Sequence, residues 1–339
     1  MSVSRKANGF DPEYSPGARN AVRVCLRIAP EEKVTVITDR ATAEIAASIV
    51  SELEELGAPH RLWTLEEEAS RPLRDMPAPI LADLESSQVS IFAAGAQQGE
   101  LRSRMQMTEV VNRRRLRHAH MVNINRQIMM EGMRADFRKV DEISTRIHQM
   151  AGAASCVRSR TPAGTALEAE FRRDYRWIKT SGIISPEKWG NLPGGEVFTT
   201  PALINGTFVI DGVVGDYLCA KYGNLSDAPL TLQVKQSRLK EVHSENRELE
   251  DEFWKYTHTD ENSDRVGEFA IGTSVELKHV IGQILQDEKF PGVHIAFGNP
   301  YGEHTGADWY SSTHIDVVGT RFQIWLDDRQ IMEEGKFLI

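Results

Sequence analysis

The stretch EKVTVITDRATAEIAASIVSELEELGAPHRLWTL, residues 32–65, predicts a strand, a helix and a second strand in succession. Residues 32–39 are a short apolar run of the kind found in buried strands. The following segment carries apolar side chains at helical spacing, and Gly57 stands where a helix C-cap is expected. HRLWTL, residues 60–65, then supplies another strand.

Two more apolar runs extend this pattern, VSIFAAG at residues 89–95 and HMVNIN at residues 120–125. Strands that alternate with helices favour parallel βαβ units, so we expect an open, Rossmann-like α/β domain. The region contains neither GxGxxG nor GxxxxGK[ST]. No nucleotide-binding motif therefore accompanies the predicted fold.

The character of the chain changes near residues 151–155, a stretch of small residues that follows an amphipathic helix predicted at residues 136–152. From Cys156 onward, strands and turns dominate, although SVELKHVIGQILQDEK at residues 274–289 predicts a helix. We therefore expect an N-terminal α/β domain at residues 1–155 and an α+β metal-binding catalytic domain at residues 156–339.

Composition limits the class of protein. The chain has 339 residues and a formal net charge of −9, which gives no reason to expect a nucleic-acid partner. No run approaches the length of a membrane span, and the N-terminus lacks the apolar core of a signal peptide. Cys25, Cys156 and Cys219 are too few and too scattered for a disulfide framework or a thiolate metal site. We expect a cytoplasmic protein that does not bind membranes.

Metal-ligand side chains stand in four short segments of the C-terminal half, each an apolar run with an acid or imidazole inside it. An unpaired polar group in a buried strand costs several kcal/mol, and metal binding is one compensation. Three carboxylates and two imidazoles suffice to hold two divalent ions that activate water. The segments are GGEVFTTP with Glu196, GEFAIGT with Glu268, GVHIAFGNPYG with His294, and THIDVV with His314 and Asp316.

The spacing in THIDVV gives the most specific local geometry. Successive side chains of a strand point to opposite faces, so His314 and Asp316 should point to the same side. Both could then bind one ion or flank a pair of ions. Alone the H-x-D pattern is weak, but the four segments in this order are more specific.

These segments, together with the DEK run before HIAFG (residues 287–298), resemble the catalytic domain of the aminopeptidase T and aminopeptidase S family, the thermophilic metallo-aminopeptidases. The resemblance covers most of residues 156–339. It implies a homodimer that acts on a small-molecule or short-peptide substrate, with two zinc, cobalt or manganese ions per chain. It also implies that the ions are held by Glu196, Glu268, His294, His314 and Asp316.

The resemblance also implies catalytic roles. It places Tyr301, seven residues after His294, in or beside the site. A tyrosine there could donate a hydrogen bond to the developing oxyanion, and a glutamate such as Glu196 could also carry a proton. The two ions would share a water, lower its pKa and polarise the substrate carbonyl.

Two other activities are compatible with the same residues. The fold also occurs in 2,5-dihydroxypyridine dioxygenase, a ring-cleaving enzyme in which two histidines and an aspartate hold one Fe(II). His294, His314 and Asp316 would supply that triad. Glu196 and Glu268 favour the two-metal hydrolase, because a mononuclear site does not need both. A catabolic amidohydrolase that cleaves a non-peptide amide is the other alternative.

Overall fold

The computed structural model of the protein describes residues 9–187, 189–215 and 217–339. By packing, the chain forms two compact units. The first runs to Arg138 and includes residues 182–194, and the second comprises residues 139–181 and 195–339. The signal-peptide prediction falls partly on residues 1–8, outside the described part. Within the described part, no helix is both long and apolar enough to cross a bilayer.

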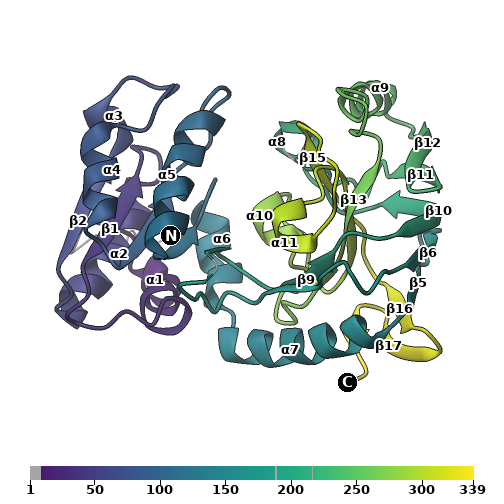
Figure 1. Cartoon of the computed structure of the whole chain (residues 1–339), viewed down its shortest axis with the longest axis horizontal. Helices are drawn as coiled ribbons and strands as arrows, with labels where there is room; N and C mark the ends of the chain where they lie inside the picture. Colours follow the sequence, from purple (N-terminus) through teal and green to yellow (C-terminus); the bar gives the residue numbers. More distant parts are fainter. Residues whose placement is uncertain (1–8, 188, 216) are drawn as a thin grey trace, which may run out of the picture. The chain divides into compact units, whose positions relative to one another are not determined.

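The first unit, coloured mostly purple to blue in Figure 1, is built on a five-stranded sheet of order β2-β1-β3-β4-β8, in which all paired strands are parallel. The strands predicted at residues 32–39, 60–65 and 89–95 are confirmed as β1, β2 and β3. Their alternation with helices gives the Rossmann-like arrangement that the sequence predicted. The strands are β1 (Val34–Thr38), β2 (His60–Thr64), β3 (Val89–Ala93), β4 (Arg117–His120) and β8 (Gly190–Asn191).

The fourth strand lies earlier than predicted, because β4 ends at His120 instead of beginning there. The residues that follow turn away from the sheet. Asn123 adopts a positive φ of 58°, and the side chain of Asn125 caps the next helix by accepting a hydrogen bond from the Ile128 N–H. Short polar side chains that bond to nearby backbone compete in this way with strand formation.

One face of the sheet is covered by helices α4 and α5. Ile37 and Phe92, which are register partners on β1 and β3, contribute to a buried cluster with Leu84 and Val111. The helices of the unit are η1 (Pro12–Tyr14), α1 (Ser15–Arg19), η2 (Asn20–Cys25), α2 (Ala43–Leu56), α3 (Leu65–Glu68), α4 (Ala78–Glu85), α5 (Leu101–Arg114), α6 (Arg126–Met130) and η3 (Gly132–Arg134).

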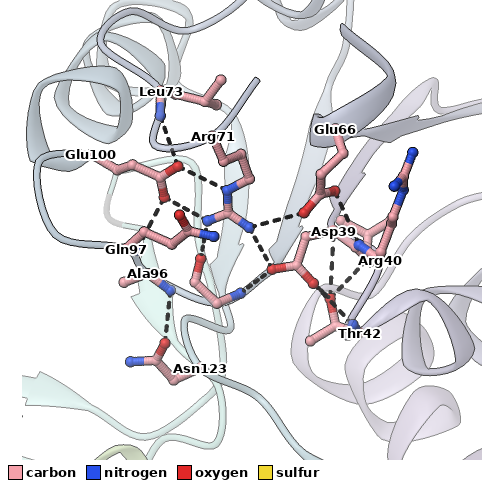
Figure 2. A network of polar contacts seen from close by, with 12 residues as sticks. Asp39, Arg40, Thr42, Glu66, Arg71, Leu73, Ala96, Gln97, Glu100 and Asn123 are labelled. Atoms are coloured by element: carbon pink, nitrogen blue, oxygen red, sulfur yellow. Dashed lines mark hydrogen bonds and ion pairs between the residues drawn. The ribbon is translucent and has the colours of Figure 1, made fainter. Parts of the chain in front are cut away.

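A buried ion network joins the loops at the carboxyl ends of β1 and β3 (Figure 2). The Arg71 guanidinium donates to Asp39 Oδ2 at 2.7 Å, to both oxygens of Glu100 at 2.5 and 2.8 Å, and to the Gly95 carbonyl at 2.5 Å. Hydrogen bonds from Arg71, Thr42 and Gly95 hold the pKa of Asp39 below its usual value, although burial alone would raise it. Arg71 therefore links the loop after β1 to the loop after β3 through its hydrogen bonds to Asp39, Gly95 and Glu100.

The second unit contains two antiparallel sheets. The eight-stranded sheet has the order β12-β11-β10-β6-β5-β16-β17-β18, and the five-stranded sheet has the order β15-β14-β13-β9-β7. The first contains β5 (Cys156–Arg160), β6 (Ala166–Glu170), β10 (Leu203–Ile210), β11 (Leu230–Lys235), β12 (Arg238–His243), β16 (Gln323–Leu326), β17 (Arg329–Glu333) and β18 (Lys336–Phe337). The second contains β7 (Ile178–Thr180), β9 (Glu196–Thr199), β13 (Val266–Gly272), β14 (Gly292–Gly298) and β15 (His314–Val318).

The two sheets share one apolar core. Phe208 and Leu232 from the larger sheet lie in the same buried cluster as Phe269, Phe297 and Ile315 from the smaller one. A parallel sheet with helices in one unit and antiparallel sheets with helices in the other confirm the predicted fold class. The helices of the second unit are α7 (Phe137–Ala153), α8 (Tyr217–Tyr222), α9 (Arg247–Tyr256), α10 (Ile284–Asp287) and α11 (Gly302–Thr305).

Helix α7 packs mainly with the second unit. Ile147 and Ala151 belong to its core, and Ile143 and Met150 pack against it. Most of α7 is therefore grouped with the β-rich part, whereas the expected boundary near residue 155 placed this helix at the end of the N-terminal domain.

The helix predicted at residues 274–289 is wrong over most of its length, since only Ile284–Asp287 (α10) is helical. Gly282 has φ +79° and Gln283 is extended, so the backbone breaks before α10. The buried Asp287 carboxylate then accepts hydrogen bonds from the Ile281 and Gln283 N–H groups at 2.9 and 2.7 Å. A helix-like apolar pattern is thus overridden by local capping and tertiary packing.

Candidate metal centre

The five predicted ligands come from four adjacent strands of the five-stranded sheet. Glu196 lies on β9, Glu268 on β13, His294 on β14, and His314 and Asp316 on β15. All four strands are paired antiparallel to their neighbours.

Strand register places these side chains on one face of the sheet. Ala296 is the register partner of Glu268 on one side and of Asp316 on the other. Directly paired residues share a face, and so do residues two apart on one strand. His294 is two residues from Ala296, and His314 is two residues from Asp316, so both face the same way. The predicted common orientation of His314 and Asp316 is confirmed.

The alternate positions face the shared core. Phe269, Ile295, Phe297 and Ile315 are fully buried in that apolar cluster. These residues fix the register, because a slip by one residue would bury the ligands in the apolar core and expose its side chains. The same alternation therefore builds the core and the site.

The ligand atoms fall into two groups that share one residue. Glu196, Glu268 and His294 form the first group, and Glu268, His314 and Asp316 form the second, with the chosen atoms of each within 4.8 Å of one another. Glu268 Oε1 lies 3.4 Å from His294 Nε2, and Glu268 Oε2 lies 3.8 Å from His314 Nε2. Glu268 thus turns one oxygen towards each group.

The chemistry of the two histidines fits a metal ion. His294 Nε2 is buried and makes no hydrogen bond, although it lies 3.5 Å from Glu196 Oε2. His314 Nδ1 lies 2.9 Å from the Asn299 carbonyl, an arrangement that leaves Nε2 available as a ligand. A backbone acceptor on the second ring nitrogen is the usual way in which proteins orient a metal-binding histidine.

The acidic and imidazole groups of the site shift one another's pKa values. Burial alone would lower the pKa of His314, but Asp316 and Glu268 outweigh it and raise the pKa to about 10. Burial alone would raise the pKa of Asp316, but the positive charges of His314, His294 and Lys289 lower it to about 2. The carboxylates Glu268 and Glu196 likewise raise the pKa of His294 against the effect of burial. Metal ions would relieve this clustering by replacing protons on the imidazoles.

The structure brings further residues to the site that had no role assigned from the sequence. Lys289 is buried, and its Nζ lies 2.7 Å from Glu196 Oε1 and also pairs with Glu288. Thr180 Oγ1 donates to the same Glu196 oxygen at 2.8 Å. Burial, together with Asp316 and Glu196, raises the pKa of Glu288 to about 8 despite the adjacent Lys289.

Only the DEK run could have pointed to Lys289 and Glu288. It belonged to the family resemblance, but it lay at the end of the helix predicted at residues 274–289 and was given no role.

Two glycines give the backbone the close approaches that the site needs. Gly195, just before Glu196, has φ +143°, and a Cβ there would lie 3.0 Å from the Ser274 Cβ. Gly298 has φ +100° beside His314, and a Cβ there would lie 2.2 Å from the Thr313 carbonyl oxygen. Side chains at these positions would displace the ligand strands.

Tyr301 lies next to the second ligand group. It follows β14 in the left-handed conformation, with φ 49°, and its ring centre is 4.4 Å from that of His314. Left-handed backbone at a residue other than glycine is uncommon and is concentrated at functional sites. The structure therefore brings all six predicted site residues into one region.

Acidic and imidazole ligands gathered on one face of a buried sheet define a metal-dependent enzyme. A family model described as thermophilic metalloprotease (M29) matches residues 133–321, more than half of the chain. The protein therefore belongs to this family, as predicted, and is a metallopeptidase, a hydrolase with a divalent-metal cofactor. A search of curated proteins by sequence finds no match.

Two solved structures share the fold over nearly the whole chain. AmpT from Thermus thermophilus is 15% identical with a TM-score of 0.72, and the match covers 96% of this chain and 99% of that chain. The 2,5-dihydroxypyridine dioxygenase from Pseudomonas putida is 14% identical with a TM-score of 0.70, and the match covers 96% of both chains. At these identities the structural similarity establishes the fold but not the reaction, which has to be inferred from the residues of the site.

Proposed function

We propose that the protein is an aminopeptidase that uses two divalent ions, zinc, cobalt or manganese, to cleave the amide bond at the N-terminal end of a short peptide or similar small substrate. The observation that carries this proposal is the position of Glu268, which belongs to both ligand groups. A carboxylate with one oxygen towards each group is suited to bridge two ions. Homodimer formation and a cytoplasmic location stay predictions.

Two ions held there would lower the pKa of a shared water and polarise the substrate carbonyl. Glu196 and His294 would complete one position, and His314 and Asp316 the other. The buried sheet face limits access of bulk water, which strengthens every electrostatic interaction within the site.

We assign Tyr301 to the substrate side of the centre. Its side chain retains 42% exposure while its ring contacts His314, so it lies between solvent and the ligands. A hydrogen bond from its hydroxyl to the developing oxyanion would contribute a few kcal/mol. We propose that the main role of Glu196 is to bind a metal ion. Its Oε1 already accepts hydrogen bonds from Lys289 and Thr180, so a role in proton transfer would depend on Oε2.

The dioxygenase reaction is the second candidate, because an enzyme of that class shares the fold. It would need His294, His314 and Asp316 around one Fe(II). The two histidines, however, fall in different ligand groups, and Glu268 stands between them. This arrangement favours the hydrolase. A non-peptide amidohydrolase would use the same centre and differ in substrate alone.

Metal analysis joined to two assays tests the proposal. We expect about two ions per chain and turnover of a leucine anilide, because two ligand groups are present. Alanine at Glu196 or Glu268 should abolish that turnover. A single iron per chain with oxygen uptake on a dihydroxypyridine would refute the proposal, as would full activity of either alanine variant. Turnover of other non-peptide amides, with cleavage of neither the leucine anilide nor a leucyl peptide, would identify the amidohydrolase.

A further inference from the structure

Lys289 places a fixed positive charge inside the candidate metal centre. Its side chain is 1% exposed, and it forms ion pairs with Glu196 and Glu288. The backbone delivers it there, because the Lys289–Phe290 segment crosses Gly272 so closely that a Cβ on Gly272 would lie 2.0 Å from the Phe290 carbonyl oxygen. Gly272 is the register partner of Glu196.

Because Lys289 binds one oxygen of Glu196, the two oxygens of this carboxylate have different partners. Oε1 accepts from Lys289 at 2.7 Å and from Thr180 at 2.8 Å, whereas Oε2 faces His294 Nε2 at 3.5 Å. Glu196 can therefore offer one oxygen to an ion, and Lys289, which also pairs with Glu288, offsets part of the negative charge of Glu196.

Among the described residues, the other ligand group has no such ion pair, although Lys289 also lowers the pKa of Asp316 from beyond ion-pair distance. Within the described part of the chain, neither Glu268 nor Asp316 lies within ion-pair distance of a lysine or arginine. Affinity for a divalent cation increases with the net negative charge of its ligands. Repulsion between an ammonium and a metal ion is also only weakly screened in a buried site.

We propose that Lys289 makes the two metal positions unequal. The position formed by Glu196, Glu268 and His294 binds its ion more weakly than the position formed by Glu268, His314 and Asp316. This inference rests on the proposed two-ion function. The centre fills in sequence, and hydrolysis follows occupancy of the weaker position beside Lys289.

Titration of the chelator-treated full-length protein with Co²⁺ alone tests this order, with calorimetry and visible absorption as readouts. We expect wild-type protein to bind in two steps whose dissociation constants differ by about tenfold or more. In Lys289→Met the weaker step should tighten by about tenfold, and the tighter step should change by less than about threefold.

Three further variants control for folding and for charge. Lys289→Gln, which can still hydrogen-bond to Glu196, should tighten the weaker step as methionine does, and it serves if Lys289→Met does not fold. Lys289→Arg keeps the charge and should keep the two steps apart. Lys221→Met is the matched surface control, because Lys221 also pairs with two glutamates, Glu248 at 2.8 Å and Glu252 at 2.7 Å. It should leave both steps unchanged.

Two equal steps in the wild-type protein would overturn the inference, and so would a weaker step that stays the same or loosens in both neutral variants. One Co²⁺ in wild-type protein and two in Lys289→Met would uphold the inequality while refuting the two-ion form of the proposed function. Two unequal steps without cleavage of any leucine anilide would likewise uphold the inference and count against the aminopeptidase assignment alone.

Discussion

Replacing Arg71 with methionine should destabilise the first unit by about 3 to 4 kcal/mol, because it leaves two buried carboxylates without their cation. The side chains of Arg71, Asp39 and Glu100 are 4%, 3% and 4% exposed. Breaking a buried ion pair from one side costs about 3–5 kcal/mol. We take the lower part of that range, since both carboxylates keep other donors. Asp39 retains the Gly95 and Thr42 N–H groups, and Glu100 retains the Leu73 N–H.

Hydrogen exchange followed by mass spectrometry can localise this loss to the peptides that carry β1 and β3. A deficit of 3 kcal/mol corresponds to exchange about 100-fold faster for amides that exchange through opening of the unit. The deficit should shrink only as the pH falls below the ordinary carboxyl pKa values, 3.8 for Asp39 and 4.5 for Glu100. In the wild type the pKa of Asp39 and that of Glu100 lie below their usual values, so this stabilisation is present above the unfolded pKa and is lost on acidification.

Arg113→Met is the matched control in the same unit. Arg113 pairs with Glu85, but their side chains are 57% and 40% exposed, so its loss should leave the free energy of unfolding nearly unchanged. If the free energy of unfolding of Arg71→Met lies within about 1 kcal/mol of the wild-type value, the proposed stabilising role of this network is refuted. Equal losses in Arg71→Met and Arg113→Met would refute it too.

Three further predictions concern the metal centre. Glu268→Gln should weaken both metal positions by about tenfold or more, measured by equilibrium dialysis with metal analysis, and loss of one ion alone would contradict a bridging role. Tyr301→Phe should lower kcat by about 10- to 100-fold with little change in KM; an unchanged kcat would remove the oxyanion role. Without metal, His314 has its pKa raised from 6.5 to about 10. Its contribution to stability is therefore complete below pH 6.5 and lost towards pH 10. Urea unfolding across this range should show the decline in metal-free protein, and a flat profile would contradict it.

The sequence was sufficient for features that depend on local periodicity. Strand alternation alone placed His314 and Asp316 on one face, and the order of four short motifs identified the family, whereas the ligand set stays a prediction. The first three parallel strands were also predicted, because buried apolar runs between helices have few other interpretations.

Features that depend on distant pairing could not be predicted in this way. The helical pattern of residues 274–289 was overridden by the carboxylate of Asp287, which binds backbone N–H groups of the preceding loop. Because α10 ends at Asp287, Lys289 lies outside the helix, and its side chain pairs with Glu196 in the site. The row from Glu268 through Ala296 to Asp316 likewise depends on the register of three strands, which single-strand patterns do not contain.

The width of the ligand set is itself an argument for two ions. Glu196 on β9 and Asp316 on β15 are separated by β13 and β14, so their backbones lie three strand spacings apart, roughly 14 Å at about 4.8 Å for each spacing. A glutamate and an aspartate side chain, each bonded to an ion at about 2.1 Å, span less than this distance. A single ion could therefore not bind both Glu196 and Asp316. Glu268, on β13, one of the two strands between them, turns one oxygen towards each ligand group, so the register of the sheet favours two neighbouring metal positions and supports the proposed hydrolysis.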